Sequence, residues 1–286
     1  MATAKIDGRT VAYDVIGEGR PWALTPGGRF SKDYGGVREL AEALAADGNQ
    51  VLVWDRPNTG ESDVCFTGDS ESEMQADALA GLLRHLEMTP AVIAGGSGGS
   101  RVSMLTAARH PDVAAALAVW WISGGVLGLI SLGYHYCSDS IRAAWNGGMS
   151  KVVELPEWQE VLESNPSNRE CMLEIDPREF IGIMERWMLV YCPRGDEVVP
   201  GLSAADAAAM DLPTLVFRGG ASDLNHPRAT SEAIAATLPD ARLVEPPWGD
   251  TEWLDRQAAR AKGESLFARW PLLAPQLVEW AGDVLG

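Results

Sequence analysis

The sequence predicts an α/β fold in which a mostly parallel central sheet is flanked by helices and carries a helical insertion. Three observations predict it. Strand-like apolar runs alternate with amphipathic helical runs in the first part of the chain, this alternation returns near the C-terminus, and a long stretch of helical pattern separates the two. Because ligands bind beyond the carboxyl ends of parallel strands, candidate site residues are expected just after the strands.

The residue pattern gives the elements in order. Before the insertion, strands are predicted at residues 9–17, 21–25, 50–55 and 91–96, and helices at 36–48 and 70–88. Ser70 fits the N-cap of the second helix, with Glu73 as its capping-box partner. After the insertion, the pattern predicts a strand at 212–220, a helix at 226–238, a strand at 241–247 and closing helix within 265–285.

The insertion is marked by a change of composition. Strand runs disappear between residues 124 and 206, and helical segments rich in Trp, Met and Leu replace them. We therefore expect one α/β core made of residues 1–123 and 207–286, with residues 124–206 as a helical cap inserted between its two parts.

The charge balance restricts the partners. The chain has 286 residues with 23 Lys and Arg against 40 Asp and Glu, a formal net charge of −17. Nucleic-acid binding and docking on anionic lipid both need a basic surface, so neither partner is expected. A small-molecule substrate is expected instead, and the sequence leaves the oligomeric state open.

The N-terminal residues lack the basic segment and apolar core of a secretory signal, and no apolar run approaches the roughly 20 residues that span a bilayer. A cytoplasmic protein with free thiols is therefore expected. The cysteines form no close pair, and the histidines show no metal-ligand spacing, so no metal or other cofactor is expected.

One serine stands out. Ser97 is the centre of Gly-Gly-Ser-Gly-Gly, between the strand at 91–96 and a helical run. The glycines allow a tight turn that would lift the hydroxyl above the sheet, with the free N–H groups of a helix N-terminus beside it. A serine hydroxyl becomes a strong nucleophile only when a base takes its proton, so a base is needed nearby.

These features resemble the α/β-hydrolase fold superfamily, in its cap-bearing branch with a serine nucleophile. Besides Ser97, "VLVWDRPNTGESD" at 51–63, "AARHPDVAAALAV" at 107–119 and "LPTLVFRGGASDLNHP" at 212–227 are similar to family segments. The resemblance makes Asp223 the catalytic acid. It also places an oxyanion loop at "LTPGGR", with the backbone N–H groups of Gly28 and Gly98 as donors.

The sequence departs from the family at the base. The family places its histidine after the last strand, where this chain reads "WGDTEW" and has no histidine. The candidates are His226, three residues after Asp223, and His135 in the cap; Asp250 or a mechanism without histidine is the alternative. In the first case Asp223 orients His226, although one short loop would then have to supply both acid and base.

The substrate side is less defined. Arg29 and Arg101 either meet a substrate carboxylate or are structural. Trp121 and His135 either line the substrate pocket or pack against other side chains of the core and cap. The tryptophans favour an apolar or aromatic substrate. The expected function is hydrolysis of an ester, lactone or activated carbon–carbon bond. The alternatives are a lyase or cyclase on the same fold, or an inactive ligand receptor.

Overall fold

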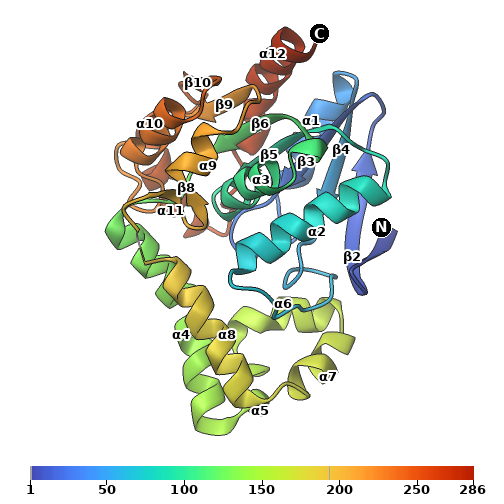
Figure 1. The fold of residues 1–286 in the computed structure, drawn as a ribbon, viewed down its shortest axis with the longest axis vertical. Coiled ribbons are helices and arrows are strands. Elements are labelled where there is room, and N and C mark those ends of the chain that lie inside the picture. Colours follow the sequence, from blue (N-terminus) through green and yellow to red (C-terminus); the bar gives the residue numbers. More distant parts are fainter. Residues whose placement is uncertain (1, 193) are drawn as a thin grey trace.

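The structure is a computed structural model that describes residues 2–192 and 194–286. Within them one large sheet forms the centre of the molecule (Figure 1). Across the sheet its strands are β1 (Ala2–Ile6), β2 (Arg9–Ile16), β4 (Asn49–Trp54), β3 (Arg20–Thr25), β5 (Ala91–Gly96), β6 (Ala114–Trp120), β9 (Thr214–Phe217) and β10 (Ala241–Val244).

Most of this sheet is parallel. All neighbours from β4 to β10 pair in parallel, whereas β1 pairs with β2, and β2 with β4, in antiparallel register. The predicted fold class is therefore confirmed. Strand β1 was not predicted: it is a short edge strand joined to β2 by a turn at Asp7 and Gly8, both in the left-handed region.

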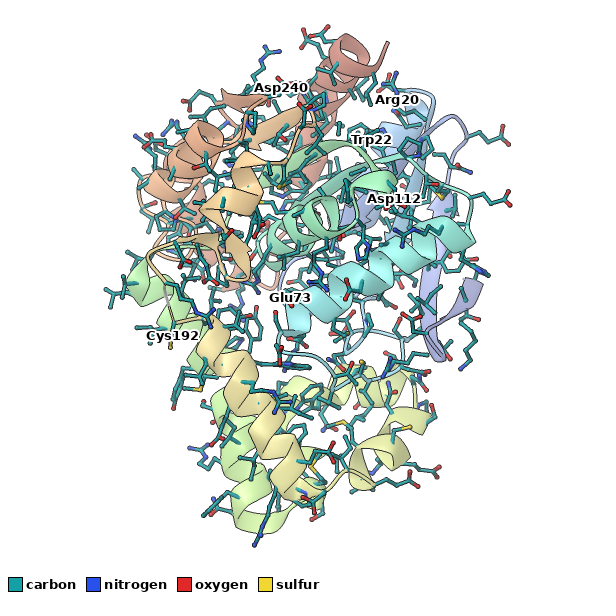
Figure 2. All side chains as sticks on the ribbon, viewed as in Figure 1. Arg20, Trp22, Glu73, Asp112, Cys192 and Asp240 are labelled. Atoms are coloured by element: carbon teal, nitrogen blue, oxygen red, sulfur yellow. The ribbon has the colours of Figure 1, made fainter. Side chains whose placement is uncertain are left out.

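Helices cover both faces of the sheet, because each predicted helix has one apolar side. The helices outside the insertion are α1 (Val37–Ala46), α2 (Glu71–His85), α3 (Gly98–Arg109), α10 (Arg228–Thr237), α11 (Glu252–Arg260) and α12 (Ala274–Leu285), with short 3₁₀ turns at Pro111–Val113 and Trp270–Leu273. One buried cluster joins α2, α3 and α10 to the sheet, and a second joins α1 and α12 to the opposite face. Figure 2 shows side chains such as Trp22 filling these layers.

A separate helical lobe, which we define as residues 126–190, lies beside the sheet at one end of the molecule (Figure 1). It consists of α4 (Val126–Gly147), α5 (Met149–Val152), α6 (Pro156–Ser164), α7 (Ser167–Leu173) and α8 (Pro177–Val190). The lobe has a buried cluster of its own, which includes Trp158, Phe180 and Trp187. Such a cluster lets the lobe hold its shape while it lies over the loops of the core.

The segment between the lobe and β9 behaves differently from the lobe. It holds a small hairpin of β7 (Glu197–Val199) and β8 (Leu202–Ser203), followed by α9 (Ala204–Ala208). Val199, Leu202 and Ala207 belong to the cluster on the α2 and α3 face of the sheet. We therefore propose that the cap proper ends near α8, and that the rest of the predicted 124–206 insertion packs with the core.

Candidate active site

Ser97 occupies a sharp turn between β5 and α3. Its φ of 57° and ψ of −122° lie in a region that residues with a Cβ rarely adopt. The turn is fixed by the Ser97 N–H, which donates to the Trp120 carbonyl at 3.1 Å. A Cβ on Gly99 would lie 2.1 Å from the Thr25 carbonyl oxygen, so α3 can approach β3 this closely only with glycine there.

The Ser97 hydroxyl meets the imidazole of His226, and the imidazole meets Asp223. Ser97 Oγ lies 2.9 Å from His226 Nε2, and His226 Nδ1 lies 2.7 Å from Asp223 Oδ2. An ionised carboxylate can only accept, so Nδ1 donates to Asp223 and Nε2 is left to accept the serine proton. The structure thus brings these three predicted residues into one hydrogen-bonded line.

The loop after β9 can supply both Asp223 and His226 because the carboxylate also shapes the loop. Asp223 Oδ1 accepts the backbone N–H groups of Asn225 at 2.9 Å and of His226 at 3.0 Å. This local turn is of the kind that aspartate side chains favour. One carboxylate oxygen therefore folds the loop, which leaves the other to hold the imidazole against Ser97.

Arg256 and Glu252 lie next to Asp223. Glu252 is one of the carboxylates in the segment "WGDTEW", and the sequence pattern did not point to Arg256. Arg256 Nη2 donates to Asp223 Oδ2 at 2.8 Å, and Arg256 Nε lies 3.2 Å from Glu252 Oε1. Both come from α11, in the segment where the family resemblance led us to expect a histidine. The only available signal was their spacing of four residues, which puts them on one helix face.

The environment tunes these groups in physically clear directions. Burial lowers the pKa of His226 below its ordinary value of 6.5, although Asp223 partly offsets this effect. Burial opposes ionisation of Asp223, but its contacts with His226 and Arg256 prevail and lower its pKa. Burial raises the pKa of Glu252 to about 7. At neutral pH the imidazole is therefore neutral and can accept a proton.

Gly28 and Gly98 lie beside each other next to the serine. A Cβ on Gly98 would be 3.2 Å from the Gly28 nitrogen. Gly98 opens α3, and the first N–H groups of a helix have no acceptor within it. Arg56 braces the loop, since its Nη2 donates to the Gly28 carbonyl at 2.7 Å and also reaches the carbonyls of Gly27 and Phe30.

The other predicted site residues differ in how they lie relative to this centre. Trp121 is buried and its ring stacks near the His226 imidazole, with centroids 6.2 Å apart and planes at 27°. His135 is exposed on α4, with its ring 5.0 Å from Tyr136. Asp250 is exposed and pairs with Arg228, so the structure does not bring it to Ser97.

Most of the tryptophans that favoured an aromatic substrate pack against other side chains of the protein. Trp158 and Trp187 lie in the core of the helical lobe, and Trp120 is buried against Trp270 at 5.0 Å between ring centroids. Trp145 is 78% exposed. Packing therefore accounts for Trp120, Trp158 and Trp187 without a ligand, whereas Trp145 faces solvent.

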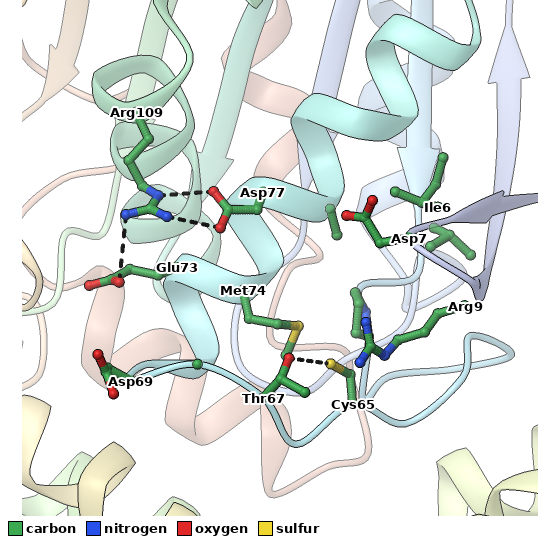
Figure 3. A pocket seen from close by; sticks show the side chains of 14 residues that line it. Ile6, Asp7, Arg9, Cys65, Thr67, Asp69, Glu73, Met74, Asp77 and Arg109 are labelled. Atoms are coloured by element: carbon green, nitrogen blue, oxygen red, sulfur yellow. Dashed lines mark hydrogen bonds and ion pairs between the residues drawn. The ribbon is translucent and has the colours of Figure 1, made fainter.

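A cavity of about 330 Å³ lies elsewhere, along α2 (Figure 3). Two of its carboxylates already pair with Arg109, which is 2.9 Å from Asp77 and 3.6 Å from Glu73. It is not lined by Ser97, so we assign it no catalytic role.

Among the described residues no cluster of His, Cys, Asp or Glu is arranged to hold a metal. Over the same ranges, no helix combines the length and apolarity that a membrane crossing requires.

Comparisons with known proteins agree with this architecture. No protein-family model matches the chain. The sn-1-specific diacylglycerol lipase ABHD11 of Mus musculus is 38% identical over 85 residues, which are 29% of this chain. The match spans only about a quarter of the length of that curated relative, 27%.

Solved structures match along almost the whole chain. Est816, described as an N-acyl homoserine lactone degrading enzyme, has a TM-score of 0.60 at 20% identity and covers 99% of both chains. An alpha/beta hydrolase from Sphaerobacter thermophilus has a TM-score of 0.57 at 22% identity, covering 98% of this chain and 99% of its own. Together with the sheet order and the turn at Ser97, these likenesses show that the chain has the α/β-hydrolase fold that its sequence predicts.

Proposed function

We propose that this chain is a serine hydrolase of a small carbonyl compound, an ester, a lactone or a compound with an activated carbon–carbon bond. The observation that carries the proposal is the line of hydrogen bonds from Ser97 Oγ through His226 to Asp223, at 2.9 Å and 2.7 Å. The fold of its structural neighbours and the description of Est816 as a lactone-degrading enzyme support the same class.

In this proposal His226 Nε2 takes the proton of Ser97 as Oγ bonds to the substrate carbonyl carbon. The negative charge that forms on the carbonyl oxygen is met by the N–H groups of Gly28 and Gly98. Such donors typically stabilise the transition state by about 3 kcal/mol each. Asp223 stabilises the imidazolium, which then gives its proton to the leaving group as the carbonyl–leaving-group bond breaks.

The second half of the reaction uses the same groups. His226 takes a proton from water, the resulting hydroxide attacks the acyl carbon, and the acyl–Oγ bond breaks while His226 returns the proton to Ser97. Atoms and charge therefore balance with no cofactor. The lyase or cyclase alternative drew its weight from the displaced histidine, and the Ser97–His226 contact supplies the base that hydrolysis needs. An inactive receptor has no need of that contact.

Labelling with a fluorophosphonate probe tests the proposal. We expect the probe to label the wild-type protein and to fail on Ser97→Ala, together with loss of turnover of short p-nitrophenyl esters. Ser150→Ala is a matched control, because Ser150 is exposed on α5 and bonds only the Gly147 carbonyl. Folded wild-type protein that is not labelled, and hydrolyses none of these esters, would argue for a receptor or different chemistry.

A further inference from the structure

Three arginine side chains of little exposure lie where the loop after β3, the start of α2 and the helical lobe meet. Arg29 follows the oxyanion glycines, and Arg101 lies on α3 one turn after Ser97. Side chains on a helix lean toward its N-terminus, which directs Arg101 back toward the serine end of α3. The third is Arg56, which is 2% exposed, while Arg101 is 5% exposed.

The cluster has more positive than negative charge. Glu71 pairs with Arg29, with Arg29 Nε 3.3 Å from Glu71 Oε1. Arg101 bonds only neutral hydroxyls, through Nε to Ser72 Oγ at 2.8 Å and through Nη2 to Tyr191 at 2.7 Å. Its Nη1 is buried without a partner, and no ion pair in the described part of the chain includes Arg101. A buried cation without a counter-ion costs several kcal/mol, so this arrangement calls for an anion.

Tyr136 of the lobe connects the arginines to the catalytic loop. Its hydroxyl lies 3.7 Å from the point that a Cβ on Gly28 would occupy. The guanidinium of Arg29 lies 5.4 Å from its ring centre. Its ring is also 6.0 Å from the ring of Tyr191, the partner of Arg101. The Tyr136 side chain thus lies close to the oxyanion loop, to Arg29 and to the tyrosine that Arg101 binds.

We propose that this cluster binds a carboxylate of the substrate, so that the hydrolase acts on carbonyl compounds that carry a free carboxylate beside the scissile group. Arg101 Nη1 and the Tyr136 hydroxyl donate to the two carboxylate oxygens, and Arg29 and Arg56 supply positive potential. Two donors match a carboxylate better than a phosphate, whose three terminal oxygens would need more. The proposal rests on the hydrolase function and adds its substrate class.

Matched pairs of esters test the proposal. The mono-p-nitrophenyl esters of succinic, glutaric and adipic acids are compared with the p-nitrophenyl esters of butanoic, pentanoic and hexanoic acids, in which a methyl group replaces the carboxylate. With the wild-type protein, we expect kcat/KM for at least one of the acidic esters to exceed that for its neutral partner by about tenfold or more. Arg101→Gln is expected to lose more kcat/KM on that acidic ester than on its neutral partner, so that the preference disappears.

Two control variants define the effect. Arg101→Lys keeps the charge and retains part of the preference, because lysine lacks the planar fork of arginine. Arg142→Gln makes the same change at an exposed position of α4, where Arg142 pairs with Asp139, and leaves both esters unaffected. Equal kcat/KM for acidic and neutral esters in the wild type would overturn the proposal. So would an equal loss on both ester types in Arg101→Gln.

A binding measurement separates this proposal from the hydrolase function and needs no Arg101 variant to fold. Calorimetric titration of Ser97→Ala with succinate, glutarate and adipate is expected to show binding of at least one dicarboxylate, and weaker binding of inorganic phosphate. If wild-type protein hydrolyses no ester but Ser97→Ala binds a dicarboxylate, the function fails and the anion site stands. If none binds, or phosphate binds more tightly, the carboxylate site is wrong.

Discussion

Arg256 donates to the same oxygen of Asp223 that accepts from the His226 imidazole: the Arg256 Nη2 to Asp223 Oδ2 distance is 2.8 Å. The guanidinium is held from the other side by Trp121, with 3.8 Å between its central carbon and the ring centre. The positive charge of Arg256 is therefore separated from the proposed base only by Asp223, and it opposes protonation of His226.

Removal of that charge is expected to change the pH profile. In Arg256→Gln the imidazolium is no longer repelled, so the pKa of His226 rises. The acid limb of kcat/KM for p-nitrophenyl acetate should then move to higher pH. Arg256→Lys keeps the charge and should leave the limb closer to its wild-type position. A limb that stays in place, or moves to lower pH in Arg256→Gln, would contradict the claim that Arg256 opposes protonation of the base.

Glu252 gives a separate prediction on stability. Burial raises the pKa of its carboxyl from 4.5 to about 7, so the folded state binds more protons than the unfolded state between these values. The free energy of unfolding should therefore fall as pH rises through this window, by at most about 3 kcal/mol. Glu252→Gln should remove this part of the pH dependence.

Chemical denaturation of both proteins at a series of pH values measures the difference. The exposed Glu232 on α10 provides a control, because Glu232→Gln should keep the wild-type pH dependence. A wild-type curve that runs parallel to that of Glu252→Gln from about pH 4.5 to about pH 7 would contradict the prediction.

Asp223 is expected to be essential for turnover. Asparagine cannot stabilise the imidazolium or accept at both oxygens, so Asp223→Asn should lower kcat by about 10⁴. Circular dichroism would verify that the loop change leaves the fold intact. Asp250→Asn is the matched control, since Asp250 is exposed and pairs with arginine away from Ser97, and it should keep kcat within about threefold. A larger loss of kcat in Asp250→Asn than in Asp223→Asn would contradict the role of Asp223.

The sequence predicted the fold well because its signals are local. The alternation of strand and helix patterns fixes a parallel sheet, and five glycine or serine residues around Ser97 fix the turn. Strand β1 was not predicted because an exposed edge strand needs no continuous apolar run. The hairpin of β7 and β8 was not predicted because strands of three and two residues are too short to show an alternation of apolar and polar residues.

The site was predictable only where its residues follow strands. Ser97 and Asp223 do so, and His226 shares the loop of Asp223, although the sequence could not show whether that loop permits the contact. The bonds of Asp223 Oδ1 to the loop backbone explain how it does. Arg256 and Tyr136 come from helices distant in sequence, and only tertiary packing brings them to the centre.

The central claim is that His226, three residues after the acid, activates Ser97. The most direct test is kcat/KM of His226→Ala for p-nitrophenyl acetate, beside His135→Ala as the control on the other candidate base. We predict that His226→Ala loses about 10³- to 10⁵-fold and His135→Ala less than about threefold, with both proteins folded. Full turnover by His226→Ala would contradict the claim.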